Sequence, residues 1–320
     1  MGEYEPGSYH VLRKVYGQTL ESLGHTYPDI VVLDAELAKS TQTAEFARSF
    51  PDRFFDLGIA EQDMMGTAAG LANYGKIVFA SSFAIFATGR AWEQIRNSIC
   101  YPSLPVRIVA THAGITVGPD GGSHQAVEDI AVMRCIPNMR VVVPADAVET
   151  EAVLEHIVKY NDGPVYVRLG RDKARTVHAS DYRFTFGYAP VLREGADVAL
   201  LACGIMTGEA VLAAEILAAE GIDAAVVNVS SIKPIDEKTI LAMAKKTGAL
   251  VTCEEHNMYG GLFSAVAEVC AMHHPVFIEP VAMYDSFGES GEPEELLEKY
   301  GLTAASIAAH ARKVLERKQS

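Results

Sequence analysis

The most informative stretch of the sequence, residues 106–125, reads VRIVATHAGITVGPDGGSHQ. Its first part, residues 106–110, is a short β-branched run that predicts a buried strand. The segment after that run contains four glycines, an aspartate and two histidines. Glycine lets the backbone approach a ligand closely, and ligands of α/β proteins bind beyond the carboxyl ends of parallel strands. The stretch therefore predicts a parallel sheet with a ligand-binding loop at one edge.

The pattern on either side of this stretch is an alternation of strands and helices. Short β-branched runs alternate with longer alanine-rich segments whose apolar residues are three and four apart. Such alternation is typical of parallel sheets covered by helices on both faces. In the first part of the chain we expect strands at residues 30–33, 77–80, 106–110, 141–143 and 165–168, and helices at residues 11–24, 61–72, 83–99 and 147–160.

A charged and weakly periodic segment at residues 172–187 interrupts the alternation, which then starts again. After it we expect strands at residues 198–202, 224–228, 249–253 and 277–280, and helices at residues 206–220, 237–247, 261–272, 293–299 and 303–318. The sequence therefore predicts an α/β protein of two domains, residues 1–185 and residues 186–320. Each domain is expected to contain a parallel or mostly parallel sheet with helices on both faces.

Charge and cysteine content narrow the possible partners. The 320 residues carry a formal net charge of -14, whereas nucleic-acid-binding proteins usually carry a basic surplus. No run approaches the roughly 18 apolar residues that a membrane helix needs. The five cysteines are far apart and form no CxxC pair, which indicates free thiols in a reducing compartment. We therefore expect a cytoplasmic protein with neither a nucleic-acid nor a membrane partner.

Two further glycine-containing segments could hold a ligand. Residues 56–62, DLGIAEQ, open a predicted helix, and residues 286–291, SFGESG, precede an acidic helix. Taken alone, Glu61 is an ordinary acidic residue in a first helical turn, and the second segment is a turn. The sequence has no GxxxxGK[ST], GxSxG, HExxH or GxGxxG motif. Their absence argues against nucleotide hydrolysis, serine hydrolysis and nicotinamide redox chemistry.

Three longer segments resemble the pyrimidine-binding domain of transketolases. They are residues 56–98, residues 111–139 and residues 142–149, and the later strings GPVYVRLGR and EEHNMYGG are similar to the same family's later part. A full-length transketolase begins with a further domain that holds magnesium and the cofactor diphosphate through a Gly-Asp-Gly sequence, and we find none here. The resemblance therefore implies the C-terminal subunit of a split transketolase. It also implies a separate N-terminal subunit as partner, with an α2β2 assembly expected from the family.

The resemblance implies thiamine diphosphate as cofactor, with Mg²⁺ bound mainly by the partner subunit and no metal site in this chain. Glu61 matches the catalytic glutamate that contacts the aminopyrimidine ring. Phe83 and Phe86 match aromatic residues around that ring, and Phe86 matches the one that stacks on it. Glycine stands at position 89, where the family often has a tyrosine. Glu36 occupies a position close to the cofactor at which many members have aspartate.

The same resemblance assigns the residues that contact the sugar. Asp120 and His124 match the contacts near the scissile bond of the donor, and His124 is expected to be catalytic. Four further residues match positions that bind the sugar phosphate: Arg13, Ser40, His112 and Arg171. For Arg13 a solvated helix charge is the alternative. The implied reaction moves a two-carbon glycolaldehyde unit from xylulose 5-phosphate to ribose 5-phosphate or erythrose 4-phosphate.

Three alternatives stay open at this point. A 1-deoxyxylulose-5-phosphate synthase shares the GIAEQ string and the DG-x-x-H loop, and it would consume pyruvate. The beta subunit of a 2-oxoacid dehydrogenase has a similar length but lacks the paired Asp120 and His124 pattern. A regulatory or assembly subunit would keep the fold without activity, but the intact set of Glu61, Phe86, Asp120 and His124 argues against this reading.

Overall fold

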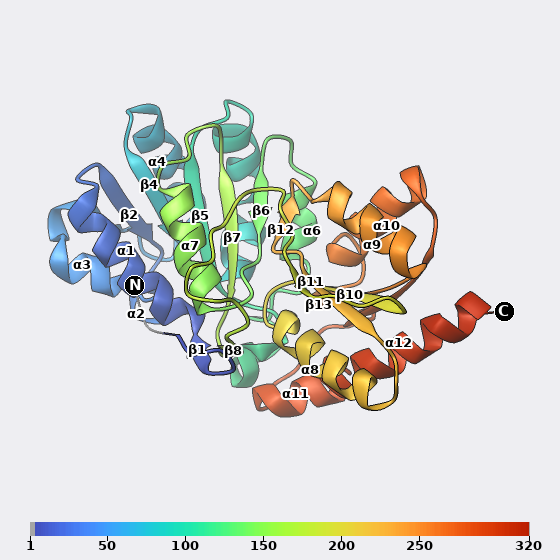
Figure 1. Cartoon of the computed structure of the whole chain (residues 1–320). Helices are drawn as coiled ribbons and strands as arrows, with labels where there is room; N and C mark the ends of the chain where they lie inside the picture. Colours follow the sequence, from blue (N-terminus) through green and yellow to red (C-terminus); the bar gives the residue numbers. More distant parts are fainter. Residues whose placement is uncertain (1–3, 320) are drawn as a thin grey trace.

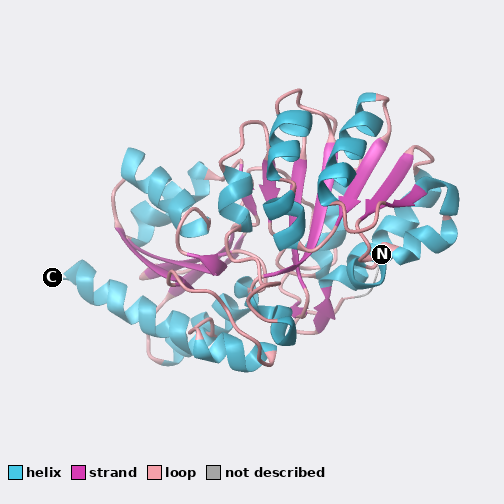
Figure 2. Ribbon diagram, turned by 180° about the vertical axis from the view of Figure 1, so that it is seen from behind, coloured by secondary structure: helices cyan, strands magenta, loops and turns pink. Residues whose placement is uncertain are grey.

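The computed structural model describes residues 4–319. It contains two large sheets, each with helices on both faces (Figure 1 and Figure 2). Most neighbouring strands within each sheet are parallel. The predicted α/β fold with mostly parallel sheets is therefore confirmed.

The first sheet has seven strands in the order β12-β6-β7-β5-β4-β2-β3. Their bounds are β2 (Ile30–Asp34), β3 (Phe54–Asp56), β4 (Ile77–Ser81), β5 (Val106–Ala113), β6 (Arg140–Val142), β7 (Val165–Gly170) and β12 (Ser231–Lys233). Its helical segments are α1 (Leu12–Thr26), α2 (Ala38–Thr41), α3 (Ala44–Ser49), η1 (Pro51–Arg53), α4 (Glu61–Asn73), η4 (Ile115–Asp120), α6 (Asp129–Arg134) and α7 (Ala147–Ile157).

Side-chain alternation explains why this sheet is covered on both faces. Every residue of β2 is buried. Val31 and Leu33 pack in the same core as Met64 of α4, whereas Ile30 and Val32 pack with residues of α1 and α7. Successive residues of a strand point to opposite faces, so a strand that is apolar at every position needs helices on both sides.

The second sheet has five strands in the order β14-β13-β10-β11-β9. They are β9 (Val191–Arg193), β10 (Val198–Ala202), β11 (Ala224–Asn228), β13 (Ala249–Asn257) and β14 (Phe277–Met283). The helices of this part are α8 (Met206–Ala219), α9 (Glu237–Thr247), α10 (Leu262–His273), α11 (Pro293–Lys299) and α12 (Ala304–Gln319). Residues of α8 and α12 share a core with one face of β10, and residues of α9 and α10 share a core with its other face.

The two sheets are joined more closely than the sequence indicated. Strand β12 follows the segment at residues 172–187, yet it pairs antiparallel with β6 and extends the first sheet. One apolar core also contains Leu33 of the first sheet and Leu201 of the second. We retain the division into residues 1–185 and 186–320 as a proposal, with the qualification that β12 crosses it.

One predicted helix is wrong in detail. In place of a continuous α-helix over residues 83–99, the chain forms a π-helical turn η2 (Phe86–Arg90), a short α5 (Trp92–Gln94) and a second π-helical segment η3 (Ile95–Cys100). A π-turn accommodates an additional residue, and such turns occur frequently at functional sites. The sequence pattern does not reveal the π-turn, because the apolar residues before the turn and those after it are still three and four apart.

Two short strands tie the start of the chain to the end of β7. Strand β1 (Tyr9–Val11) pairs antiparallel with β8 (Lys173–Arg175).

All five cysteines are free, and four of them are buried while Cys135 is exposed. Within residues 4–319, no helix combines the length and the apolar character that crossing a bilayer requires.

A buried ion pair lies where the two sheets meet. Arg168 of β7 donates from Nε to both carboxylate oxygens of Asp129, at 3.1 and 2.8 Å. Its Nη2 donates to the backbone carbonyls of Ala126 and Glu255. Both charged side chains are almost completely buried. Arg168, which the sequence analysis did not place in the site, thus connects β7 to the start of α6 and to β13.

We predict that Arg168→Met destabilises the protein by about 3 to 5 kcal/mol, because it leaves the Asp129 carboxylate buried without its cation. Urea unfolding followed by circular dichroism measures this loss. The matched control is Arg312→Met, because Arg312 pairs with Glu220 at the surface; its change should stay within about 0.5 kcal/mol. Equal losses in the two variants would contradict the role of the buried pair.

Candidate functional site

The predicted site residues lie along the edge where the parallel strands of the first sheet end. Asp34 at the end of β2 pairs with Ser81 at the end of β4, and Phe83 forms a bridge with Thr111 of β5. Strand β5 runs directly into η4. Because all these strands are parallel, the loops that follow them converge on one edge. In Figure 1 this edge faces α11 and the β1–β8 pair.

The turn before α4 brings Glu61 to this edge. The Asp56 carboxylate at the end of β3 accepts hydrogen bonds from the backbone N–H groups of Gly58 and Glu36, both at 2.9 Å. Gly58 has φ +70°, a conformation that glycine adopts without strain. Glu61 is then the first residue of α4, and its side chain is only 4% exposed. A cavity of about 660 Å³ is lined by Ile59, Glu61 and Arg90, among others.

Arg90 is a site residue that the sequence analysis missed. Its Nη1 donates to Oε1 of Glu61 at 2.9 Å, and its guanidinium carbon lies 4.4 Å from the centre of the Phe86 ring. The side chain is 52% exposed. Arg90 ends the π-turn η2, so the irregular turn directs this cation toward Glu61. Arg90 belongs to residues 56–98, the segment that resembles the transketolase domain. The spacing of a regular helix, however, gave no reason to pair it with Glu61.

Four rings form a continuous cluster next to Glu61 and Arg90. Phe83 and Phe86 stack with their centroids 5.9 Å apart. His112 stacks on Phe83 at 3.8 Å, and His124 meets Phe86 edge-on at 5.4 Å. The predicted pyrimidine-binding residues and the predicted sugar-binding histidines therefore share one surface. Gly89 lies in the same turn η2 as Phe86 and has open space where a Cβ would stand.

Cationic groups gather at the other end of the ring cluster. Burial, together with the nearby Arg13, Arg171 and His124, lowers the pKa of His112 to about 3. His112 is therefore neutral at neutral pH. Burial and the charge of Arg171 also lower the pKa of the Arg13 guanidinium. Positive charges held this close together form a site that favours an anion.

The loop residues complete this cationic end. Arg171 approaches Asp120 at 3.9 Å and donates to the carbonyl of Val117. Arg13 donates from Nη1 to the backbone carbonyl of Ser40 at 2.8 Å, so it is not a solvated helix charge. A cavity of about 530 Å³ is lined by residues from both halves of the chain: the basic Arg13, Arg171 and Lys173 and the acidic Asp172, Glu292 and Glu294.

Glu36 lies next to the turn that Asp56 holds before α4. Its side chain is exposed, its φ is +64°, and its backbone N–H donates to Asp56. Within residues 4–319, no hydrogen bond or ion pair joins its carboxylate to another predicted site residue. The role of Glu36 near a cofactor stays a prediction.

Asp34 is a second residue that the sequence analysis did not single out. Its carboxylate is fully buried and accepts hydrogen bonds from the N–H of Leu37 and from the hydroxyls of Thr41 and Thr43, at 2.7 to 2.9 Å. Burial raises its pKa to about 6 although these hydrogen bonds oppose the shift. Asp34 thus shapes the turn that carries Ser40 to the site.

The site fits one half of an aminopyrimidine cofactor. A buried carboxylate faces a cavity and stacked phenylalanine rings lie beside it, which suits a flat ring that offers a hydrogen-bonding nitrogen. A diphosphate and its metal need further groups. Among the described residues, no cluster of three or more histidine, cysteine or acidic side chains has the geometry of a metal site.

Comparison with known proteins identifies the family. The profile "Transketolase, pyrimidine binding domain" matches residues 10–176, and the profile "Transketolase, C-terminal domain" matches residues 187–307. This chain belongs to the transketolase family. Its two domains imply dependence on thiamine diphosphate.

Transketolase relatives of similar length were found. A solved structure of a split-gene transketolase, described as an inactive β4 tetramer, has a TM-score of 0.89 at 54% identity, covering 96% of this chain and 98% of that one. A Methanocaldococcus jannaschii protein provisionally named a transketolase C-terminal section is 51% identical over 94% of this chain and 95% of its own length. A 6-deoxy-6-sulfo-D-fructose transketolase subunit of Clostridium sp. (strain MSTE9) is 44% identical over 97% and 96%, respectively.

We predict that Arg90→Met lowers the free energy of unfolding of the transketolase chain by about 1 to 3 kcal/mol, since the buried Glu61 carboxylate loses its charged donor. Chemical denaturation measures the change. Arg96→Met is the control, because Arg96 is exposed and its side chain donates to the neighbouring, exposed Asn97. In the double variant Glu61→Gln with Arg90→Met, part of the loss should return. A loss no larger than in the control would argue against this pair.

We also predict a pH-dependent difference between the wild type and Asp34→Asn. The folded protein binds a proton at Asp34 more tightly than the unfolded chain, because the pKa of this carboxyl is raised to about 6. The associated stability is present below about pH 4 and is lost as the pH rises to about 6. Relative to the variant, the wild type should lose about 2 to 3 kcal/mol over this range. Parallel curves in urea unfolding would refute the shift.

Proposed function

We propose that this chain is the C-terminal subunit of a split transketolase with the activity EC 2.2.1.1. The proposed reaction transfers a two-carbon glycolaldehyde unit from a ketose phosphate, xylulose 5-phosphate, to an aldose phosphate such as ribose 5-phosphate or erythrose 4-phosphate. The observation that carries the proposal is the continuous path of rings between Glu61 and the cationic end at Arg13 and Arg171. Such a path suits a flat cofactor ring at one end and a sugar phosphate at the other.

At the cofactor end, thiamine diphosphate would supply the carbon nucleophile that cleaves and forms carbon–carbon bonds. Glu61 would hold a proton at its carboxyl group and exchange it with the ring nitrogen of the aminopyrimidine. Phe86 would stack on the ring, and such a contact contributes about 1 kcal/mol beyond area burial. The Oε1 atom of Glu61 is bonded to Arg90, so we expect Arg90 to move or to share the carboxylate when the ring binds.

At the sugar end, each residue would contact a different part of the substrate. His124 lies against Phe86 and would hydrogen-bond the hydroxyl or carbonyl of the two-carbon fragment. Asp120 would read a neighbouring hydroxyl, since a site built to bond a hydroxyl rejects analogues that lack it. Arg13 and Arg171 would bind the phosphate, for which the guanidinium fork is suited. His112 and Ser40 would donate or accept single hydrogen bonds there.

A second candidate substrate differs in its terminal anion. The relative at 44% identity is named for a sugar that carries a sulfonate. Sulfonate and phosphate are both tetrahedral anions, and the cationic end would accept either. Lys173 lines the same cavity but is paired with Glu294 at 3.6 Å, so Arg13 and Arg171 are the cations that would meet either anion.

We further propose that a separate N-terminal subunit supplies the diphosphate and Mg²⁺ sites and that the assembly is α2β2. The support is twofold. The described residues offer half of a cofactor site, and a structural relative made of one kind of subunit is described as inactive. Isolated, this chain should bind thiamine diphosphate weakly.

The deciding experiment mixes this chain with its candidate partner, thiamine diphosphate, Mg²⁺, xylulose 5-phosphate and ribose 5-phosphate, and follows glyceraldehyde 3-phosphate. Release that requires both chains would support a split transketolase, whereas tight cofactor binding and turnover by the isolated chain would refute it. Two-carbon transfer from 6-deoxy-6-sulfo-D-fructose but not from xylulose 5-phosphate would favour the sulfonate substrate, and the product to follow in that arm is the four-carbon sulfonated aldose that remains. Carbon dioxide from added pyruvate, without sugar transfer, would favour the synthase or dehydrogenase alternatives.

In the assembled enzyme we predict that Glu61→Ala lowers turnover by about 100-fold or more, because the proton-exchanging carboxyl is lost. The circular dichroism spectrum should stay unchanged. The control Glu93→Ala removes an exposed carboxylate from α5 and should leave turnover near normal. Near-normal turnover in Glu61→Ala would refute the assigned role.

A further inference from the structure

A carboxylate of the second sheet reaches into the loop that holds Asp120. Glu255, near the end of β13, accepts a hydrogen bond at Oε1 from the backbone N–H of Thr116, at 2.7 Å. Thr116 lies in η4, the segment that ends at Asp120. The Glu255 side chain is 4% exposed and comes from a part of the chain 139 residues further along the sequence. The sequence analysis placed no functional residue there.

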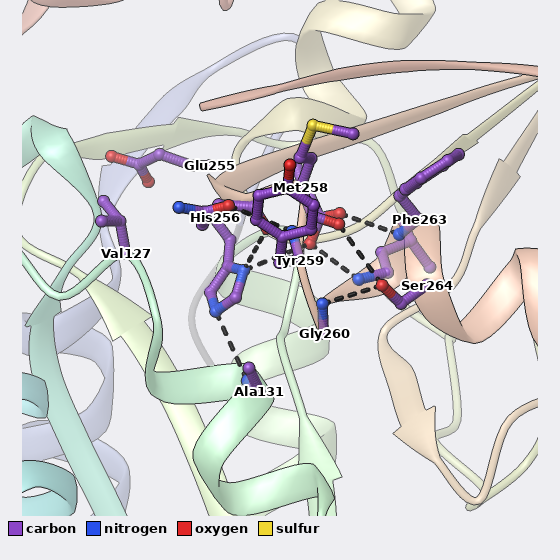
Figure 3. A network of polar contacts seen from close by, with 12 residues as sticks. Val127, Ala131, Glu255, His256, Met258, Tyr259, Gly260, Phe263 and Ser264 are labelled. Atoms are coloured by element: carbon purple, nitrogen blue, oxygen red, sulfur yellow. Dashed lines mark hydrogen bonds and ion pairs between the residues drawn. The ribbon is translucent and has the colours of Figure 1, made fainter. Parts of the chain in front are cut away.

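The direction of the side chain distinguishes Glu255 from its neighbours. Figure 3 shows its carboxylate turned toward Val127 and away from the hydrogen-bonded cluster that contains His256 and Ser264. The adjacent Glu254 points to α10, where it accepts the N–H groups of Leu262 and Phe263. Two consecutive glutamates therefore serve different elements: one caps a helix of the second sheet, and the other holds a loop of the first.

The fit between Glu255 and the loop is close. Gly114, which precedes η4, has φ +80°, and a Cβ added there would lie 2.1 Å from the carboxylate carbon of Glu255. The loop can therefore approach the carboxylate only because position 114 is glycine. Arg168 holds strand β13 in place at Glu255, because its Nη2 donates to the backbone carbonyl of Glu255 at 2.8 Å.

Burial raises the pKa of Glu255 to about 7, and Asp129 acts in the same direction, whereas Arg168 and the hydrogen bond from Thr116 lower it. Burying an ionisable side chain is costly unless it is paired and hydrogen-bonded. A carboxyl kept at this depth and hydrogen-bonded to Thr116 serves the loop that carries Thr116.

A second contact between the two halves of the chain covers the end of this loop. Gln125 donates from Nε2 to the carbonyls of Ile115 and Glu289, at 3.1 and 2.8 Å. A Cβ at Gly122 would lie 2.7 Å from the carbonyl oxygen of Gly288. The SFGESG segment, which the sequence presented as a plain turn, thus packs on the glycines that flank Asp120.

We propose that Glu255 is a positioning residue, whose hydrogen bond to Thr116 fixes the η4 loop so that Asp120 and His124 face the sugar. The part of this inference that concerns the sugar rests on the proposed function. The hydrogen bond between Glu255 and Thr116 is independent of that function. The second half of the chain thereby helps to determine donor recognition. Position 255 requires a side chain of sufficient length rather than a charged one, because its acceptor oxygen must lie within hydrogen-bond distance of the Thr116 N–H.

Two conservative variants separate reach from charge. Glu255→Asp keeps the charge next to Arg168 but shortens the side chain by one methylene, so its carboxylate no longer reaches Thr116. Glu255→Gln keeps the length and an acceptor oxygen but removes the charge. A role in positioning predicts that the aspartate variant is impaired and that the glutamine variant is close to the wild type. A general electrostatic role predicts the reverse order.

Two readouts test the inference on the full chain and on the assembled enzyme. Hydrogen exchange of a peptide spanning residues 113–122 should be at least tenfold faster in Glu255→Asp than in the wild type. The assembled variant should lose at least tenfold in kcat/KM for the ketose donor, with an unchanged Kd for thiamine diphosphate. Glu254→Asp is the control, since the same shortening one residue away should leave the loop's exchange unchanged.

Unchanged exchange in Glu255→Asp, or an equal loss in Glu255→Gln, would overturn the inference. If the wild-type assembly transfers no two-carbon unit, the proposed function fails, but the exchange measurement still decides whether Glu255 holds the loop. Faster exchange without any change in kcat/KM of an active assembly would refute the positioning role while leaving the proposed function intact.

Discussion

The buried guanidinium of Arg168 is the interaction on which the arrangement depends. Its donors bond to Asp129 at the start of α6, to the carbonyl of Ala126 behind the glycine-rich loop, and to the carbonyl of Glu255 in the second sheet. A charge at this depth is tolerated only when its hydrogen bonds are made. These three segments are therefore fixed relative to one another, and the loop between β5 and α6 lies among them.

From this junction the site extends along one edge of a parallel sheet. Its two ends differ in chemistry: the Glu61 carboxylate, paired with Arg90, lies with the phenylalanine rings at one end, and Arg13 and Arg171 lie at the other. Histidine rings connect the two ends, and His112 remains uncharged because burial and the neighbouring arginines depress its pKa. A neutral imidazole next to two cations can donate or accept hydrogen bonds without adding to their repulsion.

The sequence was informative where local pattern and position coincide. Glu61, Phe83 and His124 follow parallel strands, and residues in that place meet at one edge whatever the details of the helices. Arg90 escaped prediction because a π-turn breaks the spacing from which helical neighbours are inferred. Glu255 escaped because its partner is 139 residues away, and no local pattern encodes such a contact.

Strand β12 gives the molecule a mechanical property. This strand belongs by sequence to the second half, yet it forms the edge of the first sheet through hydrogen bonds to β6. Opening the molecule like a hinge would tear that pairing and expose the shared apolar core. The cavity at Arg13 and Arg171 thus lies between two halves that cannot separate without breaking this pairing and exposing the shared core.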